Sequence, residues 1–162
     1  MKKVSIDDIG IEVNPMEVHS VRKPVSRALG TEHFAMNYFE LEPGESFSGG
    51  MHTHHDQEEV FYVRSGTATF ETPDREVVVE EGEVIRFAPG DYQKGYNDPE
   101  EGDGTVVAFA LGAPGATHDW DELESLVPCA DCGEEKPHGV ELVSGGFELT
   151  CTDCGNTLEI GG

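Results

Sequence analysis

Basic residues are scarce in this chain of 162 residues. It has 10 Lys and Arg against 33 Asp and Glu, which gives a formal net charge of −23 at pH 7. A surface of this sign repels the phosphates of nucleic acids and the headgroups of anionic lipids. The composition therefore argues against nucleic acids and membranes as partners.

The acidic residues are spread along the whole chain rather than gathered in a tail. Their mutual repulsion opposes the compact state at ordinary ionic strength, whereas about 1 M salt shortens the Debye length to about 3 Å and screens most of it. This pattern resembles proteins of salt-accumulating cells, so we expect a halophilic protein. An acidic protein of an ordinary cell is the alternative.

Long apolar runs are also missing. The longest, residues 106–113, contains a glycine and falls short of the roughly 18 residues that a membrane helix needs. Lys2 and Lys3 are followed by Asp7 and Asp8 rather than by the apolar segment of a signal peptide. We therefore expect a cytoplasmic protein.

Cysteine is absent until residue 129, and the four cysteines that follow form two Cys-x-x-Cys pairs separated by 18 residues: Cys129, Cys132, Cys151 and Cys154. In a reducing cytosol such pairs favour a metal over a disulfide, and four thiolates suit tetrahedral Zn²⁺. The glycine after each second cysteine suits the tight turn of such a site. A redox pair of the thioredoxin type would need a βαβ context, which the sequence lacks.

Between the two pairs, strands at 140–143 and 147–150 around Gly145-Gly146 predict a hairpin. Residues 129–162 therefore resemble a zinc ribbon, a small module with four cysteines. So small a unit depends on its metal for folding, and we expect a structural Zn²⁺. Seven acidic residues and one lysine argue against nucleic acid here. Docking of this unit onto the rest of the chain or onto a partner is left open.

Short strands and turn signals alternate from residue 16 to residue 111, and no helical pattern interrupts them. Such strands, spaced roughly 8–12 residues apart, indicate an antiparallel sandwich or barrel, so the predicted fold class is all-β. The predicted strands are 16–22, 34–41, 51–54, 60–64, 67–71, 76–79, 84–87 and 106–111.

The pattern changes after residue 112. Asp119 and Glu122 are spaced as a capping box, and Trp120, Leu123 and Leu126 share one helical face. We predict a short helix over residues 119–126, with an unstructured acidic linker as the alternative. The chain then divides into a barrel (1–116), a helical linker (117–128) and the zinc ribbon (129–162).

Histidines and carboxylates cluster in the sequence from residue 52 to residue 59. On a strand, His52 and His54 point to one face and His55 to the other, and a hairpin can bring Glu59 of the next strand against the two imidazoles. Glu58 points away and is expected to be solvated. Two histidines and one carboxylate form a metal-binding set, whereas the alternative is an exposed polar strand.

These residues resemble the first signature of the cupin superfamily, whose members fold as a double-stranded β-helix, also called a jelly-roll barrel. A second cupin signature matches with two departures, because the proline comes one position late at Pro89 and Gln93 stands where a histidine is usual. The first signature also departs at its leading glycine, which is Ser46 here. The resemblance spans about residues 16–112 and rests on these matches: His52, His54, Glu59, Gly66, Gly82, Gly90 and Asn97.

The resemblance implies one divalent metal held by His52, His54 and Glu59, with Gln93 at the fourth position. An amide oxygen is a weaker ligand than an imidazole, so Gln93 either ligates weakly, bonds a metal-bound water or substrate, or marks a site that has lost tight binding. Fe, Mn, Zn and Ni are all left open. The residues expected to line the cavity are Phe61, Val63, Phe87 and Phe109.

The four remaining histidines, His19, His33, His118 and His138, are interpreted as surface residues. The edge strands of such a barrel often pair across a dimer, so we expect a homodimer.

The predicted function is metal-dependent chemistry on a small organic molecule, either O₂-dependent oxidation or Lewis-acid isomerisation of a carbonyl compound. The first alternative is a non-catalytic barrel that binds or senses a small molecule and uses the ribbon as an interaction module. The second is a storage-type barrel with a filled cavity and no metal.

Overall fold

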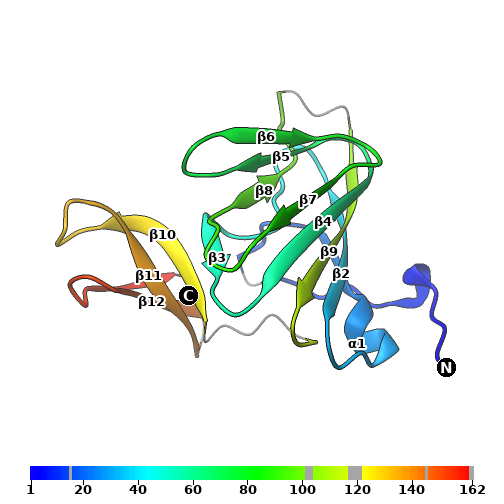
Figure 1. The fold of residues 1–162 in the computed structure, drawn as a ribbon, viewed down its shortest axis with the longest axis horizontal. Coiled ribbons are helices and arrows are strands. Elements are labelled where there is room, and N and C mark those ends of the chain that lie inside the picture. Colours follow the sequence, from blue (N-terminus) through cyan, green and yellow to red (C-terminus); the bar gives the residue numbers. More distant parts are fainter. Residues whose placement is uncertain (15, 101–103, 117–121, 145, 161–162) are drawn as a thin grey trace.

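The computed structural model describes every residue except 15, 101–103, 117–121, 145 and 161–162. It is nearly all-β, as predicted, and its strands form a barrel and a C-terminal sheet that lies beside it (Figure 1). The barrel strands are β1 (Val21–Pro24), β2 (Ala35–Leu41), β3 (His52–His54), β4 (Glu58–Ser65), β5 (Ala68–Glu71), β6 (Glu76–Val79), β7 (Val84–Phe87), β8 (Lys94–Tyr96) and β9 (Val106–Ala113). The C-terminal strands are β10 (Leu123–Cys129), β11 (Glu134–Val143), β12 (Gly146–Cys151) and β13 (Thr157–Ile160).

Three sheets account for these strands. Two of them, in the orders β1-β2-β9-β4-β7 and β6-β5-β8, face each other and form the barrel. The third has the order β13-β12-β11-β10-β3, so β3 belongs to the same sheet as the C-terminal strands. All the strand pairs are antiparallel.

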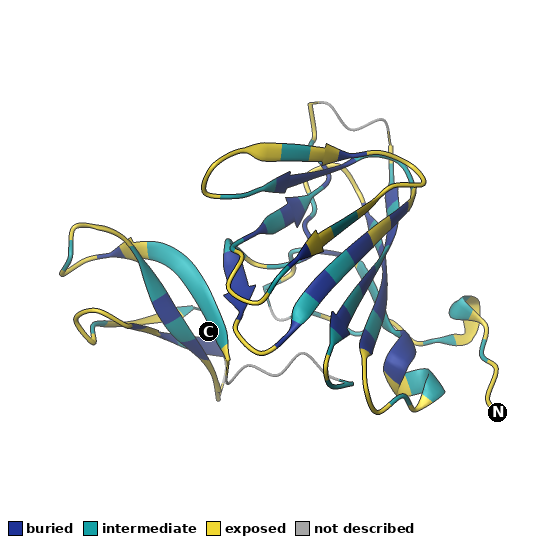
Figure 2. Ribbon diagram, in the orientation of Figure 1, coloured by how far each residue is buried: buried dark blue, intermediate teal, exposed yellow. Residues whose placement is uncertain are grey.

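Alternating side chains fill the barrel. Every second residue of β9 is buried, and the same alternation follows β4, as Figure 2 shows. The core is rich in phenylalanine, and Phe47 packs against Phe39, Phe61 and Phe70 with ring centroids 5.1–5.7 Å apart. Gly95 gives these rings room, because a Cβ there would lie 2.7 Å from Phe47 Cδ2.

The predicted strand pattern was wrong in part, because residues 16–20 of the predicted strand 16–22 form no strand, β8 was not predicted, and a helix interrupts the pattern. Helix α1 (Val25–Leu29) follows β1 and ends at Gly30, which adopts the left-handed conformation with φ 74°. A single 3₁₀ turn, η1 (Ile6–Asp8), precedes the barrel. No helix in the described part of the chain is long and apolar enough to cross a bilayer.

The predicted helix at 119–126 is also wrong where the structure describes it, because Leu123–Cys129 is strand β10; residues 119–121 lie outside the described part. β10 pairs with β3 on one side and β11 on the other. Two neighbouring strands offer hydrogen bonds that outweigh the weak helical preference of a short segment.

The C-terminal sheet has a small apolar cluster of its own. Val140, Phe147 and Leu149 form its buried centre, and Met16 from the N-terminal segment packs against them together with Leu123. The predicted ribbon strands fall inside β11 and β12, although β11 is much longer than expected. The boundary between barrel and ribbon stays a prediction, because β3 and β10 join the two in one sheet.

Candidate metal centre and cavity

Two histidines and a glutamate meet inside the barrel. His52 and His54 come from β3 and Glu59 from β4, and all three are buried. Glu59 Oε2 lies 3.9 Å from His52 Nε2, and Glu59 Oε1 lies 3.8 Å from His54 Nε2. The three potential ligand atoms lie within 4.8 Å of one another, so they could hold one metal ion.

Hydrogen bonding orients the His52 ring for this role. Its Nδ1 lies 3.0 Å from the carbonyl oxygen of Gly50, which accepts a hydrogen bond only from a protonated nitrogen. The Oγ atom of Ser48 lies 3.2 Å from the same nitrogen. With the proton on Nδ1, the lone pair of the ring is on Nε2, the nitrogen on the side of Glu59. An imidazole in this form can bind a metal through Nε2.

Gln93 occupies the fourth corner of the cluster. Its backbone bridges His52 through two hydrogen bonds of 2.9 and 3.0 Å. Its side-chain Nε2 donates to Glu59 Oε2 at 2.9 Å and lies 3.3 Å from His52 Nε2. Gln93 Oε1 is buried without a hydrogen-bond partner, and rotation of the amide would turn this oxygen toward the cluster. The fourth group therefore suits a metal site as a weak oxygen ligand.

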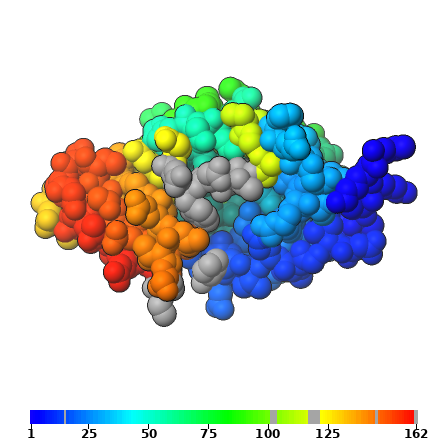
Figure 3. All heavy atoms as spheres, turned by 90° about the horizontal axis from the view of Figure 1, so that it is seen from below, coloured from blue at the N-terminus to red at the C-terminus, as the bar shows by residue number. Residues whose placement is uncertain are grey.

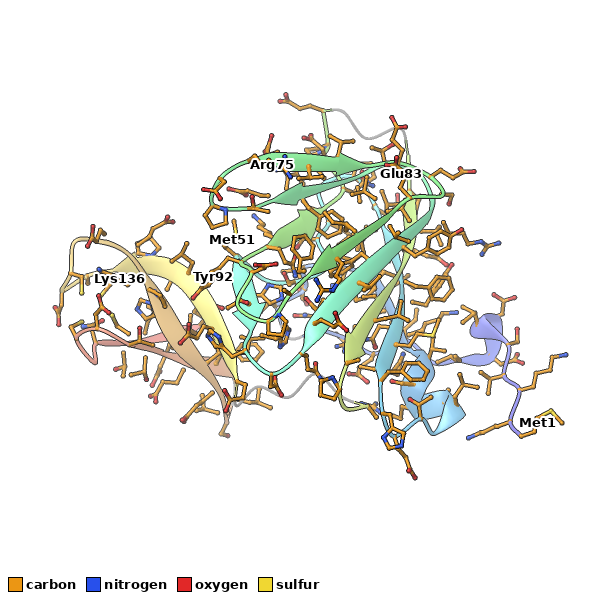
Figure 4. The ribbon with its side chains drawn as sticks, viewed as in Figure 1. Met1, Met51, Arg75, Glu83, Tyr92 and Lys136 are labelled. Atoms are coloured by element: carbon orange, nitrogen blue, oxygen red, sulfur yellow. The ribbon has the colours of Figure 1, made fainter. Side chains whose placement is uncertain are left out.

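His55 and Glu58 face away from the cluster, as expected. His55 is partly exposed, and its Nε2 lies 2.9 Å from Glu124 Oε2 on β10. Tyr92, labelled in Figure 4 where the barrel meets β10, donates its hydroxyl to the same carboxylate at 2.9 Å. Burial would raise the pKa of Glu124, but the hydrogen bonds from His55 and Tyr92 lower it overall. Glu58 pairs with Arg86 on the surface.

The cluster opens onto a cavity of about 470 Å³ with three walls. One wall is the barrel interior. The second is the N-terminal segment, which contributes His19 and Arg22. The third is the C-terminal sheet, including Leu123, Ser125 and Val127 in strict alternation along β10. Figure 3 shows the N-terminal segment and the C-terminal sheet on the two sides of one face.

The four aromatic and aliphatic residues expected to line the cavity differ in position. Phe61 lines it. Val63 and Phe87 belong to the packed core of the barrel. Phe109 lies on the outer side of β9, where its ring packs against Tyr38 at 5.3 Å. The alternation along β9 buries Ala108 and Ala110 instead, which gives the cavity room.

Two of the four histidines interpreted as surface residues are buried, which corrects that interpretation. His19 is 6% exposed and lines the cavity, and His138 is 1% exposed within the C-terminal sheet. His33 is exposed, and His118 lies outside the described residues. His19 has no local signal for burial, because its neighbours Phe39 and Ser46 come from later parts of the chain.

The four cysteines also meet, at the far end of the C-terminal sheet. All are free thiols, and their sulfurs lie within 4.8 Å of one another, with Cys129 and Cys154 3.5 Å apart. Tetrahedral zinc with bonds of about 2.3 Å separates its sulfur ligands by about 3.8 Å. The spacing therefore fits one zinc ion.

Backbone turns shape this cluster as the glycines predict. Gly133 and Gly155 adopt φ values of 74° and 77°, and each donates its N–H to the carbonyl of the first cysteine of its pair at 2.9 Å. Backbone N–H groups of Cys154 and Asp153 lower the pKa of Cys151 to about 6. A thiolate is the form that binds metal, so these amides favour a metal site.

Comparison with known proteins gives one family. The sequence model of the cupin domain matches residues 37–109. A search of the curated proteins finds no match.

Solved structures share the fold at low sequence identity. A sugar phosphate isomerase of the cupin superfamily from Silicibacter pomeroyi is 16% identical, with a TM-score of 0.58 over 99% of this chain and 92% of that one. A polyketide cyclase from Streptomyces resistomycificus is 25% identical, with a TM-score of 0.58 over 70% of this chain and 79% of that one. A predicted oxalate decarboxylase from Thermotoga maritima is 18% identical, with a TM-score of 0.57 over 70% and 99%. These three names describe different reactions.

Proposed function

We propose that the barrel, which the cupin-domain model matches over residues 37–109, binds one divalent metal ion and uses it in chemistry on a small organic molecule. His52, His54 and Glu59 are the ligands in this proposal. The observation that carries it is the convergence of three buried ligand atoms within 4.8 Å on the wall of a cavity of about 470 Å³.

The side chains of the cluster have separate tasks. His52 is held in the ligating tautomer by Gly50, and Glu59 lies between the two imidazoles. Gln93 either holds the Glu59 carboxylate through its Nε2 or, with its amide rotated, offers its oxygen as a weak ligand. Because an amide replaces an imidazole, metal affinity is lower than that of a site with three histidines.

A metal bound here would supply a Lewis acid and, if it is redox-active, a site for O₂. The chain supplies the surroundings. Phe61 and the apolar side chains of the C-terminal sheet exclude water from the cavity, which strengthens electrostatic interactions with a bound molecule. O₂-dependent oxidation and Lewis-acid isomerisation both suit these surroundings, and the identity of the metal decides between them: iron favours the first, zinc or manganese the second.

The four-cysteine unit is proposed to hold a structural Zn²⁺. Its support is the sulfur spacing and the two glycine turns. Among the residues that the structure describes, three form its buried apolar centre (Val140, Phe147 and Leu149), so we expect the metal to contribute much of its folding free energy.

Metal content per chain tests both sites. We expect two metals per wild-type chain, purified without a tag in high salt, and one in His52→Ala. The control is His33→Ala, which removes an exposed histidine and should keep both metals. Equal metal content in wild type and His52→Ala, after incubation with Fe, Mn, Ni or Zn, would overturn the barrel site.

Turnover then separates an enzyme from a binding protein. We expect the metal-loaded protein to convert a member of a panel of phenols, thiols and keto acids, with O₂ consumption if the metal is iron. A non-catalytic sensor is the second candidate, favoured by the amide of Gln93 in place of an imidazole. It predicts ligand binding without turnover.

We also propose that the protein is a homodimer, and light scattering tests this proposal.

A further inference from the structure

Two buried polar atoms on the N-terminal wall of the cavity have no hydrogen-bond partner among the described residues. They are Nε2 of His19 and Nε of Arg22. Both side chains line the same cavity as His52, His54 and Glu59. An unpaired buried polar atom is costly, and a bound ligand is one reason to keep it.

His19 is fixed as a hydrogen-bond acceptor toward the cavity. Its Nδ1 lies 3.0 Å from the carbonyl oxygen of Ser46 and must donate to it. Its ring packs edge-on against Phe39 at 5.2 Å. Burial lowers the pKa of His19, and the charge of Arg22 lowers it further against the opposing hydrogen bond to Ser46. Nε2 therefore carries a lone pair and no proton at neutral pH.

Arg22 lies on the same side of the sheet. It stands directly opposite Phe39 in the pairing of β1 with β2, so both side chains point into the cavity. Phe39 is thus the common neighbour of His19 and Arg22. The two unpaired atoms belong to one region of the wall.

The charge of Arg22 is only partly balanced. Glu12 is its salt-bridge partner, at 3.5 Å, and the same carboxylate also pairs with Arg27. One carboxylate therefore serves two guanidinium groups, which leaves one positive charge in excess. Guanidinium stays charged when buried, so this excess favours an anionic partner.

We propose that His19 and Arg22 form a second polar subsite of the cavity, which binds a small hydroxylated organic anion. Arg22 Nε donates to a carboxylate or phosphate oxygen of the ligand, and His19 Nε2 accepts a hydrogen bond from a hydroxyl. The apolar part of the ligand lies against the C-terminal sheet, where Leu123 and Phe147 line the cavity. This inference rests on the proposed function, since it names the class of molecule that the cavity takes.

The net charge of −23 limits which anions can reach such a subsite. The field of the whole molecule repels anions, so an anion enters only where local positive charge and hydrogen bonds compensate. High salt screens the general repulsion more than it screens a buried pair. The subsite should therefore work at high ionic strength.

Three related probes test the proposal on the full-length, metal-loaded wild type by calorimetry. Mandelate carries a carboxylate, a hydroxyl and a phenyl ring; phenylacetate lacks the hydroxyl, and methyl mandelate lacks the charge. We expect mandelate to bind about tenfold more tightly than either analogue. Glucose 6-phosphate carries a phosphate and hydroxyls but neither a carboxylate nor a phenyl ring, so tighter binding of this probe than of mandelate would assign the anionic oxygen to a phosphate. Equal affinity for mandelate and both analogues would overturn the subsite, as would no binding of any probe.

Variants assign the effect to the two side chains. Arg22→Lys keeps the charge and removes Nε, and it should weaken anion binding about tenfold. His19→Phe keeps a ring against Phe39, and it should abolish the preference for mandelate over phenylacetate. The controls are Arg75→Lys and His33→Phe, which change exposed residues. Unchanged anion binding in both test variants would refute the assignment.

The two proposals can fail separately. If the wild-type barrel takes up no metal and the protein still discriminates the probes through Arg22 and His19, the subsite stands and the metal-dependent function falls. If the barrel binds metal and the Arg22 and His19 variants bind every probe like wild type, the subsite falls and the metal site stands.

Discussion

Replacing Cys129 with serine should weaken metal binding at the barrel site, although the cysteine belongs to the other metal cluster. Cys129 ends β10, and β10 pairs with β3, which carries two of the proposed ligands. In this register Leu123 stands opposite His54 and Ser125 opposite His52. Loss of zinc should disorder the C-terminal unit, because the metal supplies much of its folding free energy.

The size of the effect follows from the contacts that hold β3. Besides the strand pairing, the N–H of Leu126 donates to Met51 at 2.9 Å, and the N–H of His55 donates to Glu122 at 3.0 Å. Each hydrogen bond contributes about 0.5–1.5 kcal/mol net. Losing these two bonds alone would lower the free energy that keeps β3 in place by about 1–3 kcal/mol. This loss corresponds to roughly 5- to 150-fold weaker metal binding in the barrel.

Competition with a chelator measures this effect. The barrel metal of Cys129→Ser should be released at lower chelator concentration than that of wild type. Leu142→Ala is the control, because it truncates an exposed side chain in the same C-terminal unit and touches neither cluster. Equal barrel affinity in Cys129→Ser and wild type, with the zinc shown to be lost, would refute coupling through β10.

Three further predictions test the site and the core. Gln93→His should tighten barrel metal binding by about tenfold or more in the same chelator assay, because imidazole is the stronger ligand. Gly95→Ala should lower the unfolding free energy by about 1–3 kcal/mol in chemical denaturation, since its Cβ would meet Phe47 and Phe70. Burial lowers the pKa of His19 from its ordinary 6.5, so the unfolded chain takes up a proton at this histidine before the folded chain does. The stability that His19 contributes is therefore present above pH 6.5 and is lost as the pH falls. Stability measured at pH 7.5 and 5.5 should fall less in His19→Phe than in wild type.

The metal cluster could be predicted because its parts are local. His52 and His54 share a face by the two-residue period of a strand, and Glu59 follows five residues after His54. The expected hairpin is wrong, because β3 and β4 lie in different sheets, but the short connection still brings Glu59 to the two imidazoles. The cysteine turns are local in the same way, since each depends on a five-residue pattern, Cys-x-x-Cys-Gly, that ends in glycine. The all-β class followed from the spacing of turns, which is again a short-range property.

The errors arose where distant parts of the chain decide the structure. The cavity is lined with a period of two by Leu123, Ser125 and Val127. Leu123 and Leu126 also fit a helical period, so the local sequence is compatible with both structures. Pairing with β3 and β11 selects the strand. His19 looks like any polar residue in the sequence. Its burial depends on Phe39 and on Ser46, which lies 27 residues away.

The N-terminal segment and the C-terminal sheet both line the cavity, beside the barrel residues. Met16 of the N-terminal segment packs on Val140 and Phe147 of the C-terminal sheet, and it passes so close to Gly49 that a Cβ there would collide with its side chain. The N-terminal wall is therefore held between the barrel opening and the C-terminal sheet. The proposed metal ligands and Arg22 come from barrel strands, whereas His19 and the side chains of the C-terminal sheet that line the cavity come from segments outside the barrel core. In the proposed function, the N-terminal and C-terminal walls of the cavity therefore determine which molecules fit beside the metal.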